Sequence, residues 1–261
     1  NYEHGDVIHR FMDDDSETGI ECRVGMATSS ALFSLDENLP REIRLRVSLG
    51  EDLKGHPLPG KKTSSTWQRA LRGSARLQIP DERISFLYDA AVRTLVLLSA
   101  GDIVPGPYTY RRFWFRDACL MINALLSLGF KERVSRLLDS FIPRQERSGY
   151  FKSQEGEWDS NGQVLWIFDR YRQLTGNDLP PGWIAAALKG ARWIARKRAS
   201  KGEAEHRGLL PPGFSAEHLG PNDYYYWDDF WGLAGLKAAA RIARQGRMPD
   251  QEQALLREAA D

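Results

Sequence analysis

Residues 108–130 read YTYRRFWFRDACLMINALLSLGF, and this stretch predicts the fold more clearly than any other part of the chain. Apolar side chains recur at helical spacing from Cys119 to Leu128, and Gly129 supplies a stop. The pattern therefore predicts a helix over about residues 115–129, with an aromatic segment that leads into it.

Arg116 and Asp117 fall in the first turn of this expected helix. An acidic side chain there faces the positive end of the helix dipole, and an arginine can form a two-pronged clamp on a hydroxyl-rich or carboxylate ligand. The same pair is also explained by an aspartate that caps the helix and an arginine that faces solvent. The residues alone leave both explanations open.

Composition excludes several classes of protein. A formal net charge of +1 over 261 residues offers no broad basic face, so we expect no nucleic-acid partner. No apolar run approaches the ~20 residues that span a bilayer, so we expect no membrane partner. Cys22 and Cys119 do not reveal the compartment. The compartment stays unknown, although the lack of a charged and then apolar leader favours the cytoplasm.

The first part of the chain, residues 1–65, is predicted to be a β-rich segment. Ile43, Leu45 and Val47 alternate with polar residues, as in a strand whose sheet has one wet face. The turn-forming stretch GHPLPGKKTSS, at residues 55–65, ends this part. Residues 66–261 then change to long helical patterns and are predicted to form a separate helical domain.

The helical domain repeats one plan, in which a short turn joins two helices and a long loop leads to the next pair. Helices are expected over residues 82–100, 115–129, 131–142, 160–175, 181–198 and 225–244, and from 249 to the end. This order predicts stacked helical hairpins. The long loops at 105–117, 146–163 and 203–229 each precede an apolar helix, so they should project from one end and converge on one pocket.

These three loops carry the side chains that a sugar site needs. A sugar ring offers apolar faces and a rim of hydroxyl groups, so its site combines aromatic platforms with carboxylates, amides and arginine. The candidate substrate-binding residues are Tyr110, Trp114, Arg116, Asp117, Trp158, Asp159, Asn161, Tyr225 and Trp227. We therefore expect a carbohydrate as the substrate or ligand.

Cleavage of a glycosidic bond usually takes two carboxyl groups, one protonated and one ionised. Glu217 lies between Phe214 and a run of tyrosines, and aromatic surroundings raise the pKa of a carboxyl group by desolvation. Glu217 is therefore the expected acid, and Asp228 and Asp229 are further catalytic candidates. Both aspartates are equally explained as caps of the last long helix.

Other kinds of site lack support. His206 and His218 are twelve residues apart with Glu217 between them, which matches no metal-ligand spacing, so no metal and no cofactor are expected. Neither a phosphate-binding glycine loop nor a nucleophile elbow is present. Phe230 and Trp231 are expected to be core residues of the last long helix.

Three segments resemble the glucoamylase-like enzymes of the six-hairpin glycosidase superfamily. YTYRRFWFRDACL is similar to their aromatic-x-x-Trp-x-Arg-Asp segment, and EWDSNGQVLW resembles the segment that opens the next inner helix. GLLPPGFSAEHLGPNDYYYWDDFWGLAGL is similar to the loop and helix that hold the general acid in bacterial relatives. The resemblance covers about residues 105–240. It implies a mainly α fold, an (α/α) helical-hairpin toroid, and a preceding β-sandwich of which residues 1–60 resemble the end.

The resemblance also implies roles for single residues. Arg116 and Asp117 would hold hydroxyl groups of the sugar in the innermost subsite. Trp114 and Trp158 would wall the pocket, and Glu217 would be the proton donor.

The expected acid segment departs from the family pattern. SAEHLG lacks the paired Glu-Glu of glucoamylases, so Asp223, Asp228 or Asp229 remains an alternative donor. The resemblance further implies inversion, with water activated by a second carboxylate. That base is expected beyond Asp261, because the chain supplies about half of the helices of such a toroid. An open half-toroid exposes apolar helix faces, so self-association or completion by a C-terminal half is expected.

The sequence thus predicts a glycoside hydrolase that acts on a terminal sugar of an oligosaccharide or glycoconjugate by general acid and base catalysis. Two alternatives remain. One is a carbohydrate-binding module without activity, and the other is a glycoside phosphorylase of a related toroid.

Overall fold

The computed structural model describes residues 63–198, 204–216 and 220–260. The chain divides into two units, Asn1–Leu58 and Pro59–Asp261, and every described residue belongs to the second unit. The β strands expected before residue 50 therefore lie outside the described residues. Residues 63–65, which were assigned to the β-rich segment, are instead the start of the first described helix.

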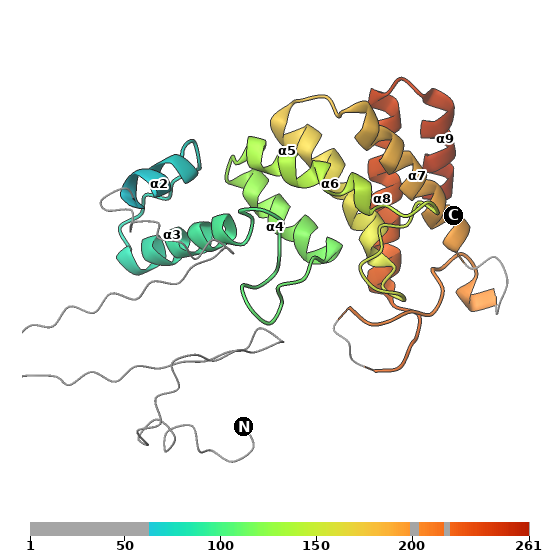
Figure 1. The fold of residues 1–261 in the computed structure, drawn as a ribbon. Helices are drawn as coiled ribbons and strands as arrows, with labels where there is room; N and C mark the ends of the chain where they lie inside the picture. Colours follow the sequence, from blue (N-terminus) through green and yellow to red (C-terminus); the bar gives the residue numbers. More distant parts are fainter. Residues whose placement is uncertain (1–62, 199–203, 217–219, 261) are drawn as a thin grey trace, which may run out of the picture. The chain divides into compact units, whose positions relative to one another are not determined.

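The described residues form a mainly helical structure, as predicted, and no strand occurs among them. Figure 1 shows the helices in chain order. They are α2 (Thr63–Ala70), α3 (Glu82–Leu97), α4 (Phe115–Ser127), α5 (Lys131–Asp139), α6 (Asp159–Thr175), α7 (Pro181–Lys197), α8 (Tyr226–Gln245) and α9 (Pro249–Glu258), with short 3-10 helices η2 (Ile142–Arg144) and η3 (Ala204–His206). Of the α-helices described, only α2 was not predicted, and the short η3 was not predicted either.

Local signals explain several helix ends. The side chain of Asp81 accepts a hydrogen bond from the Ile84 backbone N–H at 3.0 Å, which caps the start of α3. Gly176 adopts a left-handed conformation (φ 73°) and ends α6, which suits a residue without a side chain. Proline opens α7 and α9, where its missing N–H has no helical partner to lose.

Helices α4 and α6 run in the same direction. At their starts, Arg116 of α4 forms an ion pair with Asp159 of α6 at 2.7 Å. Further along both helices, Arg170 of α6 donates to the side chain of Asn123 of α4 at 3.3 Å. The first turns of α4 and α6 therefore lie at the same end of the array.

Helices α6 and α8 are also parallel. Trp227 in the first turn of α8 donates to Asp159 in the first turn of α6 at 2.7 Å, and further along Arg241 of α8 pairs with Asp169 of α6 at 2.6 Å. Since α4, α6 and α8 each begin at this end, the three loops before them lead there, as the sequence predicted.

Contacts also join α4 to α5, α6 to α7 and α8 to α9, which is compatible with stacked hairpins. Closure into a toroid stays a prediction.

Two glycines let α6 and α8 approach closely. A Cβ atom on Gly162 of α6 would lie 2.0 Å from the backbone oxygen of Trp231, and one on Gly235 of α8 would lie 2.5 Å from the Cα atom of Gly162. Any larger residue at Gly162 would therefore push the helices apart. This crossing holds the first turn of α8 beside the first turn of α6.

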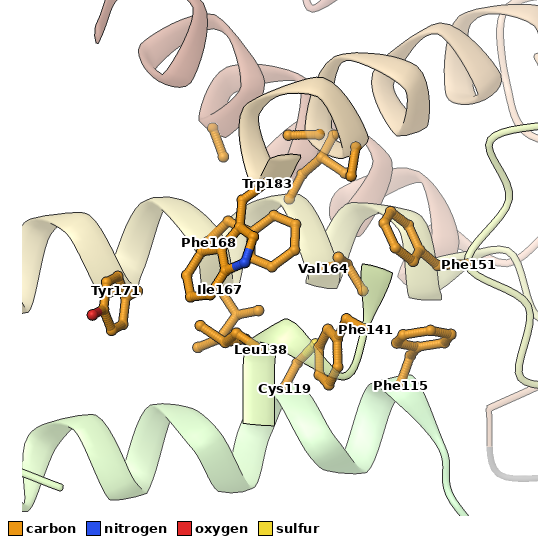
Figure 2. Close-up of a cluster of buried hydrophobic side chains, with 14 of the residues drawn as sticks. Phe115, Cys119, Leu138, Phe141, Phe151, Val164, Ile167, Phe168, Tyr171 and Trp183 are labelled. Atoms are coloured by element: carbon orange, nitrogen blue, oxygen red, sulfur yellow. The ribbon is translucent and has the colours of Figure 1, made fainter. Parts of the chain in front are cut away.

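Aromatic rings fix α4 and α7 on α6 (Figure 2). Phe115 of α4 lies edge-on to Phe141 and to Phe151, with ring centroids 5.1 and 5.3 Å apart. On the other side of the cluster, Phe168 of α6 stacks on Trp183 of α7 at 5.2 Å. Such pairs contribute specific geometry beyond the burial of their area. Phe141 and Phe151 in turn contact Phe168, with ring centroids 6.4 and 6.5 Å apart, so this group of rings connects α4 to α6.

The structure corrects the core expectation on α8. Phe230 is 69% exposed and stacks on the exposed Tyr226. Trp231 is only half-buried and packs edge-on to Trp166 at 5.3 Å, so it lies at the margin of the core and not within it. None of the helices described is both long and apolar enough to cross a membrane.

Candidate functional site

A buried carboxylate, Asp159, joins the first turns of α4, α6 and α8. Its Oδ2 atom accepts hydrogen bonds from Arg116 Nε at 2.7 Å, from Trp227 Nε1 at 2.7 Å and from Gln163 Nε2 at 3.1 Å. Asp159 is 1% exposed, whereas Trp227 is 41% exposed. These three donors, one of them charged, hold the Asp159 carboxylate in place. We call Asp159 and the groups around it the Asp159 cluster.

Glu157 extends the cluster to a second tryptophan. Its Oε2 atom accepts a hydrogen bond from Trp114 Nε1 at 3.1 Å and lies 3.4 Å from a terminal nitrogen of Arg116. Glu157 is 1% exposed, and its backbone oxygen accepts a hydrogen bond from the Tyr150 hydroxyl at 2.7 Å. The indoles of Trp114 and Trp227 are thus each tied through Nε1 to a buried carboxylate, and Arg116 links the two carboxylates.

Sequence reasoning missed Glu157. The only signal available was its place two residues before Asp159, at the junction of a long loop and a helix. That position does not separate a buried ligand of arginine from a solvated loop glutamate. Its partners Trp114 and Arg116 lie 43 and 41 residues earlier in the chain, so only the packing of α4 on α6 assigns its role.

Asp228 is a buried carboxyl group with a raised pKa beside Asp159. It is 4% exposed, and its side chain accepts a hydrogen bond from the backbone N–H of Asp159. Burial, followed by the negative charges of Asp159 and Asp229, raises the pKa of Asp228 to about 8, although Arg116 acts in the opposite direction. At neutral pH the carboxyl group of Asp228 is therefore mostly protonated.

Two further aspartates flank the cluster. Burial raises the pKa of Asp117, which is half-buried, and the positive charge of Arg116 opposes this change. Burial also raises the pKa of Asp229, whose Oδ1 atom accepts a hydrogen bond from the Leu210 backbone N–H at 2.8 Å. Asp229 thus holds the preceding loop against α8, while Asp228 turns toward α6.

Two acceptor atoms in the cluster have no hydrogen-bond partner among the described residues. They are Asp159 Oδ1 and Gln163 Oε1, and the hydroxyl of Ser160 shares this property. Asp159 and Gln163 are 1% and 0% exposed. Buried polar atoms are nearly always paired, so these atoms call for a donor supplied by water or by a ligand.

Arg116 differs from its expected role. It was expected to clamp a hydroxyl-rich or carboxylate ligand with two prongs. In the structure its Nε atom and one terminal nitrogen face Asp159 and Glu157 instead, and its side chain is 15% exposed. The guanidinium therefore orders the cluster from inside the protein.

Trp158 and Asn161 point into the protein. Trp158 is 5% exposed and donates through Nε1 to the Pro211 carbonyl oxygen at 3.0 Å. Asn161 is 0% exposed, accepts a hydrogen bond from the Phe151 N–H at 2.8 Å and donates to the Gly190 carbonyl oxygen at 3.0 Å. These contacts support structural roles, since they fix the loop before α6 and the α6–α7 hairpin.

The remaining candidates are dispersed. Tyr110 is 63% exposed, and the hydroxyl of Tyr225 donates to the Pro221 carbonyl oxygen at 2.6 Å. Glu217, the expected acid, lies outside the described residues. The cluster therefore unites Trp114, Arg116, Asp159, Trp227 and Asp228 out of the predicted set.

Comparison with known proteins adds no relative. No family model matches the sequence, and no curated protein or solved structure matches it. The resemblance to six-hairpin glycosidases stays a prediction. Within the described ranges, no group of three or more His, Cys, Asp or Glu side chains is arranged to hold a metal ion.

Proposed function

We propose that the protein is a glycoside hydrolase that acts on a terminal sugar, with Asp228 as its proton donor. The observation that carries this proposal is the pair formed by Asp228 and Asp159 beside the indole ring of Trp227. General acid catalysis at a glycosidic oxygen needs a carboxyl group that is still protonated at working pH. The pKa of about 8 gives Asp228 that property, and the charge of Asp159 contributes to it.

Each neighbour has a chemical task in this proposal. The Asp228 proton passes to the glycosidic oxygen as the bond to the anomeric carbon breaks. Trp227 offers an apolar platform for the sugar ring, and Arg116 forms an ion pair with Asp159 beside the proposed donor. The base that activates water in an inverting reaction is expected from the resemblance alone. Glu217 stays the alternative acid.

A carbohydrate-binding module is the second candidate. It is favoured by the contacts of Asp159, because its Oδ2 atom already accepts three hydrogen bonds, one of them from Arg116, and so is not free to activate water. Such a module would bind sugars through the Asp159 cluster and cleave none.

The test compares substrates whose leaving group must be protonated by the enzyme with substrates whose leaving group departs unprotonated. The chain, and the full product of the reading frame that contains it, are assayed with natural disaccharides and with nitrophenyl glycosides, whose leaving group departs without protonation. We expect Asp228→Asn to lower turnover of disaccharides by about 10²–10⁴-fold and that of nitrophenyl glycosides far less. Asp89→Asn, which removes an exposed aspartate of α3 far along the chain from the candidate site, is the matched control.

Other results would redirect the proposal. If Glu217→Gln shows this selective loss and Asp228→Asn does not, Glu217 is the acid. Saturable sugar binding without hydrolysis in either product would establish the binding module. Cleavage only in the presence of inorganic phosphate would indicate a phosphorylase.

A further inference from the structure

Carboxyl groups outnumber guanidinium groups in and around the Asp159 cluster. The carboxylates of Glu157 and Asp159 both face the single guanidinium of Arg116, and Asp117 adds a third carboxyl group beside it. Arg112, whose guanidinium lies over the Trp114 ring, and the positive ends of α4, α6 and α8, at about half a unit each, offset this charge. The preference for a cation therefore depends on which atoms of the cluster face the ligand.

The unpartnered atoms of the cluster require a donor as well. Asp159 Oδ1 and Gln163 Oε1 can only accept hydrogen bonds, and both are buried. Gln163 directs its amide at Asp159, because its Nε2 atom donates to Asp159 Oδ2 at 3.1 Å. A protonated amine offers three donors with a charge, whereas a hydroxyl group offers one.

The indoles of the cluster supply the third part of a cation site. A cation is attracted to the face of an indole ring, and the cluster already shows this, since the guanidinium carbon of Arg112 lies 3.9 Å from the ring centroid of Trp114. Trp227 is tied to Asp159 through Nε1 and packs edge-on to Trp231 at 5.8 Å, which leaves it 41% exposed. Part of the Trp227 ring is thus open to a ligand.

We propose that the site binds a cationic sugar, with a protonated primary amine between the Trp227 ring and the acceptor groups of Asp159 and Gln163. The preferred substrates are then glycosides of hexosamines with a free amine. This inference rests on the proposed function for the sugar framework and adds the charge of the ligand.

Acidic sugars are disfavoured by the same contacts. Arg116 already engages Asp159 and Glu157, so it has no free fork for a ligand carboxylate. The carboxylate of a uronic acid would lie beside Asp117 and Glu157 with no positive group to pair with it. An unpaired charge costs binding free energy in a partly buried site.

Calorimetric titration with glucosamine, glucose, N-acetylglucosamine and glucuronic acid tests the proposal. The proteins compared are the unaltered chain, Trp227→Leu and Trp227→Phe. Trp67→Leu is the control. Trp67 of α2 also makes a contact with a cation, because the guanidinium carbon of Arg93 lies 5.0 Å from the centroid of its ring. We expect glucosamine to bind about tenfold more tightly than glucose or N-acetylglucosamine, as one charge-assisted hydrogen bond implies.

The preference should disappear in Trp227→Leu, persist in part in Trp227→Phe and persist fully in the control. Added salt should weaken the binding of glucosamine and leave that of glucose unchanged. Equal affinity for glucosamine and glucose, or tighter binding of glucuronic acid, would overturn the inference and leave the proposed function standing.

Titration with methylammonium separates the two kinds of failure. If no sugar binds, while methylammonium binds the unaltered chain and not Trp227→Leu, the cation site is supported and the sugar function is contradicted. If neither methylammonium nor glucosamine binds, the inference is overturned.

Discussion

Replacement of Asp228 by asparagine tests the protonation of this carboxyl group directly. In the folded chain, burial and the nearby charges raise its pKa to about 8, whereas the ordinary value is 3.8. Unfolding returns the group to that ordinary value. Between these two pH values the folded state binds a proton that the unfolded state has lost. The free energy of unfolding must therefore fall as pH rises through this range.

The size of the effect follows from the two pKa values. A pKa difference of about 4 corresponds to about 5 kcal/mol, which is the upper bound for the stability lost between about pH 4 and pH 8. Water penetration and local relaxation lower the effective cost of a buried charge, so we expect about 2–4 kcal/mol. Asparagine does not ionise, and its side-chain oxygen can still accept the hydrogen bond from the Asp159 N–H. The stability of Asp228→Asn should consequently exceed that of the parent by a growing margin as pH rises.

The assay is urea unfolding of both proteins, followed by circular dichroism, at intervals from pH 5 to pH 9. Asp89→Asn, which removes an exposed carboxylate from α3, controls for the loss of a surface charge. A stability difference between Asp228→Asn and the parent that stays constant over this range would refute the reasoning. Asp228 would then be ionised throughout, and the proposed proton donor would be lost.

Two further changes probe the packing that builds the site. Gly162→Ala should lower the free energy of unfolding by about 3 kcal/mol, because its new methyl group meets a backbone oxygen of α8 at 2.0 Å. Gly182→Ala, which meets no atom within 4 Å, should instead be neutral or raise stability by about 1 kcal/mol; equal melting temperatures of the two variants would contradict this. Glu157→Gln removes a buried ion pair but keeps an acceptor for Trp114, so urea unfolding should show a loss of about 1–3 kcal/mol. Glu132→Gln, at an exposed position of α5, should show no loss of stability. Equal losses in Glu157→Gln and Glu132→Gln would argue against a stabilising ion pair at Glu157.

Much of the helical architecture was predictable from local pattern. The apolar spacing and glycine stop of residues 115–129 gave α4 to within two residues at its end, and the starts of α7 and α9 agree with the prediction. The order of short turns and long loops also gave the common end at which α4, α6 and α8 begin. The helix α2 was missed, because its eight residues hold few apolar side chains and carry no long periodic signal.

The candidate site was predictable only in its composition. Trp114, Arg116, Asp159 and Trp227 were recognised because aromatic and charged residues before apolar helices suit a polar ligand. Glu157 was missed, and Trp158 and Asn161 point inward, because spacing does not tell which way a loop side chain turns. That direction depends on partners such as the Pro211 and Gly190 carbonyl groups, which come from distant parts of the chain.

The sequence by itself determined the helices, their pairing into hairpins and the kinds of side chain at their common end, since these follow from periodicity and residue chemistry within short segments. Only the tertiary structure decided which of those side chains meet. The crossing at Gly162 places Asp228 beside Asp159, and this contact between residues 69 positions apart accounts for part of the raised pKa. The same packing turns Arg116 onto two buried carboxylates instead of toward a ligand. Burial and the distances between charges control both results, and neither quantity exists until the helices pack.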